Sequence, residues 1–533
     1  MPTRLRESWI GSLWLFLTVL VPQPTGQYRQ VHTTVRVRSV RLATRPSPRL
    51  GHSLFLGLTA QFLWLLCCLW SYTVVARTFA YEGFVIAAPV GAEKLLAIVL
   101  ALIGLSFILP RRLANPADYV IVGLFDISFV PFCAYWALSN QPWWQGLLVM
   151  IYWGLVLLVD QVPLRPTFHY MKGAQNTMFL VAGGLVVLGG ILIVAGGHLT
   201  LRLPLGDVYA VRTVWASEGS GMSMYLFPWL ANVLLPLLLG HAWKNRRLGE
   251  LLILGFTAYM LFTSTGMKAY LFMPALVAVV LLVATWRPPS SFIPLGLGTF
   301  ASTMVLLDNI TRSVTWSSLG VRRVFFVPAH LTSVYLEFFA TNPVTRLSDS
   351  TLLRGWLQYP YPVSVPHMIG AVLGQPAMNA NNGLVADGVA NFGIWGGLIW
   401  AVGLGMLIRL LRAATERRED RPEAWAVTAT WPIVLLSSAL TTSLLTHGLA
   451  LGLLAAWSLR PNRRSQPFHQ TSGQVPAAIG LADGAISNRH GLQFASSLKP
   501  TSVRESCGHR SGEQVRAHDA DTWQESKGLL KRD

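Results

Sequence analysis

Apolar runs of membrane-spanning length recur along most of this 533-residue chain. Every backbone N–H and C=O group in lipid must be bonded within the protein, so only helices or closed barrels can span a bilayer. The runs are continuous and do not alternate with a period of two, which is typical of helices and excludes a barrel. Charged residues make up only 12% of the chain, against about a quarter in soluble domains. The sequence therefore predicts an all-α, polytopic transmembrane helical bundle.

We expect about twelve spans, of which the shorter ones are marginal for a bilayer about 30 Å thick. They lie near residues 53–76, 84–109, 118–138, 143–163, 177–197, 224–240, 249–266, 269–286, 290–307, 391–412, 424–443 and 445–458.

The connections between these runs alternate in charge, whereas short connections such as 139–143 and 444–448 nearly lack Lys and Arg. Basic residues occur in every second connection, at Arg111/Arg112, Arg165/Lys172, Lys244/Arg246/Arg247, Arg287, Arg412/Arg417/Arg418/Arg421 and Arg460/Arg463/Arg464. The positive-inside rule then places both ends of the twelve-span unit in the cytoplasm. A large external loop, 308–390, is expected between spans 9 and 10, and a second external connection at 198–223. The same rule accounts for much of the net charge of +18 without nucleic acid.

Two terminal segments stand apart from the transmembrane domain expected over residues 51–458. Residues 1–50 form a basic extension, in which Ser8 to Pro22 fits a signal-peptide core or a short extra helix. A translation start after this extension is a further alternative. Residues 459–533 are rich in Ser, Gly, Gln, Arg and Asp without periodicity, and predict a disordered cytoplasmic tail.

Lys and Arg residues in the external connections are exceptions to the positive-inside trend, and we therefore predict that they have a function. An arginine fork matches a phosphate or carboxylate, and it stays charged. The plainer alternatives are that arginines of the first connection pair with Asp207 and Glu218, and that the lysine of a short outer turn snorkels to the interface. The candidate binding residues are Arg202, Tyr209 and Arg212 in the first connection, Lys268 in the short turn, and Arg312, Arg322 and Arg323 in the long loop.

Acid–base candidates follow in the long loop. The apolar, aromatic stretch from Val324 to Phe339 could be an amphipathic helix in the interface. His330 and Glu337 are seven residues apart on it, on roughly one face, and either could be a general base or acid. The plainer reading is a polar face that touches headgroups or water. His367 follows three prolines that favour an extended, non-helical loop.

Charged residues inside spans are functional hypotheses by default. Glu93, Lys94, Asp126 and Asp160 are of this kind, and Asp126, near mid-span, would suit a proton relay. The chain has no Walker loop, HExxH, GxSxG or CxxC pattern, and its DxD pair, Asp519 and Asp521, lies in the tail. We therefore expect neither a metal nor a cofactor.

The stretch "NANNGLVADGVANFGIWGGLIW", from Asn379 to Trp400, puts a polar cluster directly before an apolar helix. Glycines there permit tight turns, and Asn391 is well placed to cap an incoming helix. The pattern predicts a capped turn at the outer surface, where the chain re-enters the bilayer near Phe392. A helix cap formed by Asn391 does not explain the presence of Asp387 in this stretch. Its predicted role is to orient one of the outer cations or to contact a substrate.

Several stretches resemble the O-antigen polymerase group of bacterial oligosaccharide-repeat-unit polymerases, in the same order as in that family. They reach from about 205 to 450, and the N-terminal spans match only in being apolar. The stretches are "VYAVR" with Arg212, "TGMKAYLF" with Lys268, "RRVFFVPAHLTSVYLEFFATNP" with Arg323, "NNGLVADGVANFGIWGG", and "TTSLLTHGL" from Thr441 to Leu449.

This resemblance implies a metal-independent glycosyltransferase in the bacterial inner membrane. Such enzymes join oligosaccharide repeats linked to polyprenyl diphosphate into a surface polysaccharide, on the outer face of the membrane. Arg212, Lys268 and Arg323 would neutralise the leaving diphosphate, and another arginine would bind the acceptor's diphosphate. The candidate bases are Glu337, His330, Asp387 and His367, and Asn382 is expected to contact the sugar. The implied partners are the lipid-linked substrates, membrane lipid, a chain-length regulator and a flippase, and no nucleic acid.

Two alternatives stay open. One is a ligase of the same fold that moves a finished glycan to another acceptor. The other is a transporter, such as a lipid-linked-sugar flippase or proton-coupled carrier, in which Glu93, Asp126 and Asp160 would be the working residues. A two-fold repeat of interrupted spans is missing from the sequence, which argues against the transporter.

Overall fold

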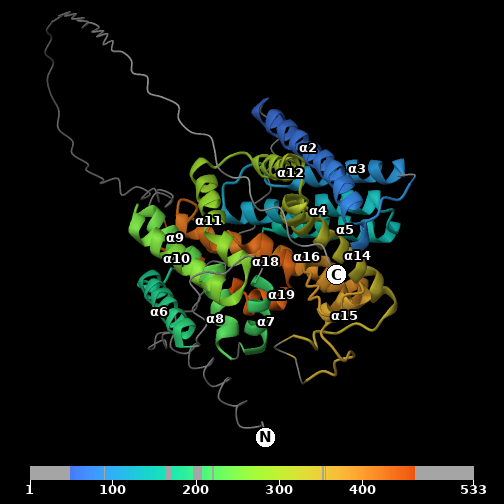
Figure 1. Ribbon diagram of the computed structural model, residues 1–533. Helices are drawn as coiled ribbons and strands as arrows, with labels where there is room; N and C mark the ends of the chain where they lie inside the picture. Colours follow the sequence, from blue (N-terminus) through green and yellow to red (C-terminus); the bar gives the residue numbers. More distant parts are fainter. Residues whose placement is uncertain are drawn as a thin grey trace, which may run out of the picture. The chain divides into compact units, whose positions relative to one another are not determined.

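The computed structural model describes residues 48–88, 91–163, 170–195, 207–218, 221–350, 353 and 356–461 (Figure 1). Within these residues the named elements are all helical. Ten of the described helices are long and apolar enough to cross a membrane. The predicted all-α membrane fold is thereby confirmed, whereas the count of twelve spans and the external loop 308–390 remain predictions. Residues 1–47 and the tail from 462 lie outside the described part.

The first half of the chain contains α2 (Pro48–Thr78), the 3-10 turn η1 (Ala80–Glu82), α3 (Ala92–Ile108), α4 (Pro116–Leu138), α5 (Trp143–Gln161), α6 (Ala174–Ala195), α7 (Val208–Glu218), α8 (Ser223–Trp229), the π-helical η2 (Leu230–Leu234), α9 (Leu235–Lys244) and α10 (Leu248–Thr265). The second half contains α11 (Lys268–Trp286), α12 (Phe292–Thr311), α13 (Thr315–Ser317), the π-helical η3 (Ser318–Phe326), α14 (Val327–Thr341), α15 (Val365–Val372), α16 (Leu384–Thr415), α17 (Pro422–Thr428), α18 (Trp431–Ser437), α19 (Leu440–Leu445) and α20 (Leu449–Ser458).

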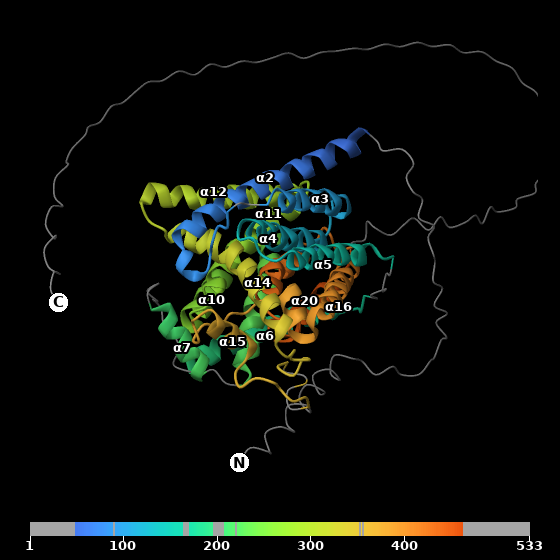
Figure 2. The same cartoon turned by 90° about the vertical axis from the view of Figure 1, so that its right-hand side faces the viewer.

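Helix α4 lies at the centre of the bundle, where it packs against α2, α5, α14, α16 and α18. Its best apolar window is 94% buried, whereas that of α12 is only 17% buried. A helix that is apolar on every side is stable only when other helices or lipid surround it. We conclude that α4 is a core helix, and that α12 turns much of its surface to the surroundings beside α2, as Figure 2 shows along its top.

Contacts between the connections define one end of the bundle, which we call the Arg412 end. Arg112 and Pro289 form an isolated backbone bridge, and the Ser290 N–H donates to the Arg111 carbonyl oxygen over 3.1 Å. At the same end Arg287 pairs with Asp420. The basic connections that the sequence places on one side of the membrane thus meet at one end of the bundle.

The connections at the opposite end define what we call the His330 end. The Ala87 N–H donates to the Leu138 carbonyl oxygen over 2.9 Å, and Ser333 Oγ donates to Gln145 Oε1 over 2.6 Å. These contacts join the loop after α2 to the end of α4, and α14 to the start of α5. Elements that adjoin connections predicted to be external therefore also meet at one end.

The sequence predicts a loop here, with one helix lying alone in the interface, but the structure of residues 315–341 is different. They form α13, η3 and α14 in continuous succession, and α14 packs against both α4 and α16. Phe325 inserts its ring beside Trp64 of α2, with the ring centres 5.1 Å apart. Apolar side chains occur on more than one face of this segment, which allows it to be buried between helices.

Candidate functional site

The polar stretch before α16 is buried, contrary to the prediction of a capped turn at the outer surface. Ala380, Asn382 and all residues from 384 to 391 are buried. Tyr335 donates its hydroxyl hydrogen to the Ala380 carbonyl oxygen over 2.9 Å, and the Gly383 N–H donates to the Leu436 carbonyl oxygen over 3.0 Å. The chain can bury this loop because neighbouring helices satisfy its polar groups.

Helix α16 is two helices joined by a sharp turn at Phe392 and Gly393, whose backbone angles are not helical. Gly388 and Gly396 would lie about 12 Å apart in a straight helix. Here a Cβ added to Gly388 would approach the Gly396 carbonyl oxygen to 2.5 Å. The two parts therefore fold back onto each other, and Gly393 supplies the positive φ of 66° that the turn needs.

Asp387 joins the two parts of α16 to each other. Its Oδ2 atom accepts a hydrogen bond of 2.6 Å from Trp400 Nε1, and its Oδ1 atom accepts one of 2.9 Å from Asn391 Nδ2. The prediction that Asn391 caps an incoming helix was wrong, because its side-chain oxygen accepts from the Leu347 N–H over 2.8 Å and not from the backbone of the second part of α16. Asn391 Oδ1 also accepts from Thr345 Oγ1 over 2.8 Å.

A second interrupted segment meets Asp387. Helix α18 ends at Ser437 and α19 begins at Leu440, with extended backbone at Ser438 between them. The Leu440 N–H donates to Asp387 Oδ2 over 2.7 Å, and Ser438 Oγ lies 2.9 Å from His447 Nε2. Trp400, Ser438 and His447 were not predicted as site residues. The run of small polar residues "SSALTTS" (437–443) is the one signal in the sequence for this break.

The close approach of the two parts of α16 gives the first testable prediction. Gly396→Ala should destabilise the protein by about 1–3 kcal/mol, because its methyl group would overlap the Gly388 carbonyl oxygen and the backbones must separate. Gly403→Ala on the same helix is the matched control, since its nearest contact would be an ordinary 3.7 Å to Leu440. Thermal unfolding in detergent measures both. Equal midpoints for the two variants would contradict the close packing.

His330 is enclosed, and the structure separates its surroundings from those of Glu337. His330 Nδ1 lies 2.9 Å from the Tyr135 hydroxyl, its ring lies beside Phe84 with centres 5.2 Å apart, and its Nε2 atom is buried without a partner among the described residues. Glu337, seven residues on, is exposed. Of the two predicted acid–base groups, Glu337 is the one that solvent or a substrate can reach in this structure.

The neighbouring arginines of η3 have different roles. Arg322 is buried, pairs with Glu82 and stacks its guanidinium 4.4 Å above the Phe79 ring. Arg323 is exposed. The positive charge of Arg322 is therefore used inside the protein, whereas that of Arg323 is available at the surface of the His330 end.

Arg212 and Lys268 are brought together by a tight packing contact. Gly266 has a φ of 65°, and a Cβ added there would lie 2.5 Å from the Val208 carbonyl oxygen and 3.2 Å from Arg212 Cβ. Helix α7 thus lies directly on the turn that precedes α11, whose first residue is Lys268. Arg212 is exposed and Lys268 is half-buried. Two predicted phosphate-binding cations are neighbours for this reason.

The remaining predicted site residues lie apart from one another. Arg312 is exposed at the left-handed C-cap of α12, and His367 is exposed on α15 with Ser364 Oγ 2.8 Å from its Nδ1 atom. Asn382 Nδ2 donates to Thr332 Oγ1 over 3.0 Å and so holds its buried loop against α14. Tyr209 lies on α7, but its side chain is outside the described part of the protein. Arg202 is outside it altogether.

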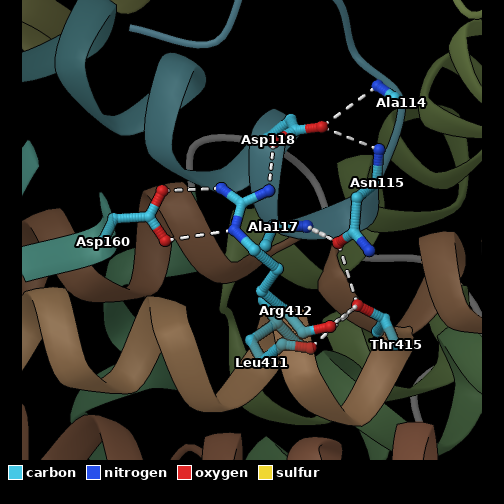
Figure 3. Close-up of polar contacts among 8 residues, drawn as sticks. All are labelled: Ala114, Asn115, Ala117, Asp118, Asp160, Leu411, Arg412 and Thr415. Atoms are coloured by element: carbon cyan, nitrogen blue, oxygen red, sulfur yellow. Dashed lines mark hydrogen bonds and ion pairs between the residues drawn. The ribbon is translucent and has the colours of Figure 1, made fainter. Parts of the chain in front are cut away.

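Asp160, which a transporter could have used, is held in an ion-pair network at the Arg412 end (Figure 3). Arg412 donates from Nη2 and Nε to the two Asp160 oxygens over 2.7 and 3.1 Å, and its Nη1 atom pairs with Asp118. Asp118 also caps α4, since its Oδ2 atom accepts from the Asn115 N–H over 2.9 Å. The network ties the start of α4 to the ends of α5 and α16.

A metal site is not evident, since the described residues contain no group of three or more His, Cys, Asp or Glu side chains that could hold an ion. Comparisons with protein-family models, with curated proteins and with solved structures find no match for this chain.

Proposed function

We propose that the protein is a membrane glycosyltransferase that elongates a glycan from polyprenyl-diphosphate-linked oligosaccharide units at its His330 end. The observations that carry the proposal are the contact that makes Arg212 and Lys268 neighbours and the exposure of Arg323 on η3 at the His330 end. The sequence predicts that all three cations lie on the side of the membrane opposite the basic connections. The positive-inside rule favours the Arg412 end for the cytoplasm. The His330 end would then face outward, where lipid-linked repeat units would be joined in a bacterial inner membrane.

In the proposed reaction an acceptor hydroxyl loses its proton and its oxygen attacks the anomeric carbon of the donor. The bond from that carbon to the donor diphosphate breaks, and polyprenyl diphosphate leaves with the bonding electrons. Arg212, Lys268 and Arg323 would stabilise the charge that develops on this leaving group. Glu337 and His367 are the exposed candidates for the base, and the enclosed His330 would act only after a local opening.

The experiment is a reconstitution of the purified full chain with a lipid-diphosphate-linked repeat unit. A ladder of longer lipid-linked glycans supports the polymerase. A single transfer to a different acceptor indicates the ligase, and movement across the membrane without a new bond indicates a transporter. No product and no movement with several repeat units would refute the proposal.

A proton-coupled carrier is a second candidate, and one observation favours it. Two interrupted helical segments meet at Asp387, and interrupted helices commonly surround substrate sites in transporters. Both interruptions lie between residues 384 and 445, however, and no matching pair occurs in the first half of the described chain. This arrangement is weaker support for a carrier than two related interruptions would be.

Asp387 has either a structural role or a chemical role in elongation, and the difference gives the second prediction. Asp387→Asn leaves one amide N–H₂ opposite another donor, which should cost about 1–3 kcal/mol of stability. Trp400→Phe is the matched variant, because it removes one donor to the carboxylate and keeps the carboxylate itself. If Asp387 only joins the helices, both variants should lose elongation in proportion to their loss of stability. If it acts in the chemistry, Asp387→Asn should lose elongation far beyond Trp400→Phe.

A further inference from the structure

The middle of α4 holds a carboxyl group that the proposed function does not use. Asp126 has no exposed surface, and its Oδ1 atom accepts a hydrogen bond of 2.7 Å from Gln61 Nε2 on α2. The Trp64 indole N–H donates to the Asp126 main-chain oxygen over 2.9 Å. The other carboxyl oxygen, Oδ2, and Gln61 Oε1 are both buried without a partner in the described part of the chain.

The two orphaned oxygens belong to one pair, and a single proton would satisfy both. Burying an ionised carboxylate in an apolar interior with only one neutral hydrogen-bond donor costs several kcal/mol of free energy. A protonated carboxylic acid and a primary amide can form two hydrogen bonds, from the amide N–H₂ to the acid carbonyl and from the acid O–H to the amide oxygen. The first of these bonds is present. The second needs a proton on Asp126 Oδ2 and the approach of Gln61 Oε1 to that oxygen.

Charged and titratable groups on α4 and the elements packed against it have other positions or partners and do not replace this proton. On α2 and α4 these groups include the thiols of Cys67, Cys68 and Cys133 and the hydroxyls of Tyr72 and Tyr119, which donate to the Val85 and Ala429 carbonyl oxygens. At the Arg412 end the others are Asp118, Asp160, Arg409, Arg412 and Glu423. Towards the His330 end they are Arg77, Glu82, Glu93, Lys94, Arg322, Arg323, Tyr135, His330, Tyr335 and Glu337. Asp308 of α12 accepts from backbone N–H groups of α13, and Tyr152 and Asp387 lie beside or on α16.

A pocket between α2, α3 and α4 leads towards this pair. Its walls include Gly57 and Gln61 of α2, Ser106 of α3, and Val122, which lies one helical turn before Asp126 on α4. Arg111 lines it at the Arg412 end. The pocket offers ≈ 30 Å³ to water, which is room for about two molecules. Ser106 Oγ and Gln61 Oε1 are both buried without a partner in the described chain, so water in the pocket would find groups to bond.

We propose that this α2–α4 pocket admits water and protons from the Arg412 end, and that Asp126 paired with Gln61 binds one proton at its inner end. On uptake a hydronium ion in the pocket gives its proton to Asp126 Oδ2 and remains as water. On release the proton returns to a water molecule by the reverse step. The site is independent of the reaction proposed above, because it lies within α4 and uses none of the residues assigned to that reaction.

Infrared spectroscopy of the full chain in liposomes tests the site. The wild-type protein should show the carbonyl band of a protonated carboxylic acid, and Asp126→Asn should lack that band. Gln61→Leu should keep the band but shift it towards the frequency of an unbonded acid. If Asp126→Asn does not fold, Asp126→Glu serves instead, with the band displaced. An unchanged set of carbonyl bands in a folded Asp126 variant would overturn the proposal.

The path is tested by transfer of the same liposomes into heavy water, which shifts the band as the acid proton exchanges. Gly57→Leu should slow this exchange several-fold, because its side chain fills the pocket. Gly104→Leu is the matched control, since an added Cβ meets nothing within 4 Å at either glycine and Gly104 does not line the pocket. Equal exchange rates in the two folded variants would overturn the assignment of the pocket as the path.

Discussion

Arg412→Met should destabilise the protein by about 3–5 kcal/mol, because it leaves buried carboxylates without their cation. The Asp118 and Asp160 side chains are 8% and 1% exposed, and Arg412 is their shared ion-pair partner. Neither carboxylate can recover its lost interactions from water without opening the helix ends. The measurement is thermal unfolding in detergent, followed by intrinsic fluorescence, together with the yield of monodisperse protein.

Two variants make this result specific. Arg287→Met removes another Arg–Asp pair at the same end, but its partners are 41% and 59% exposed, so the loss should stay within about 1 kcal/mol. A triple variant, Arg412→Met with Asp118→Asn and Asp160→Asn, should recover much of the stability, since no buried charge is left alone. An Arg412→Met protein as stable as Arg287→Met would show that the network does not hold these helices.

The helical class of the protein could be predicted from the sequence because it depends on local composition. The grouping of the connections at two ends of the bundle could also be predicted, because basic and non-basic connections alternate along the sequence. The Arg112–Pro289 bridge joins two of the basic connections at one end. The pairing of individual charges could not be predicted. Arg322 and Arg323 are adjacent in the sequence, yet Glu82 pairs with Arg322, because η3 packs against the end of α2.

The polar stretch before α16 shows why the site itself was harder to predict. A turn at the membrane surface and a buried loop require the same Asn, Gly and Asp residues, because both need polar groups bonded to the backbone. Which of the two forms depends on distant partners such as Tyr335 and Leu436, and single-sequence patterns do not show them. Likewise, the seven-residue spacing of His330 and Glu337 did not reveal that Gly83 and Phe84 would cover the histidine.

The arginines of η3 also give the sharpest test of the proposed function. Arg323→Ala should lower the rate of glycan elongation by about 10²–10³, the usual effect of removing one donor to a developing negative charge. Its stability should change little, because the side chain is exposed. Arg212→Ala should behave in the same way, since Arg212 is also exposed and lies beside the turn that leads to Lys268.

Arg322→Ala is the matched control, and the opposite pattern is expected of it. Its removal would leave Glu82 without its cation and the Phe79 ring without a stacked guanidinium, so the thermal midpoint should fall clearly. Elongation per folded molecule should fall less than in Arg323→Ala. Size-exclusion profiles, unfolding midpoints and elongation ladders on the three variants separate loss of fold from loss of activity. Full elongation in both Arg212→Ala and Arg323→Ala would remove the cations from the reaction and with them the main support for a diphosphate-bearing donor at the His330 end.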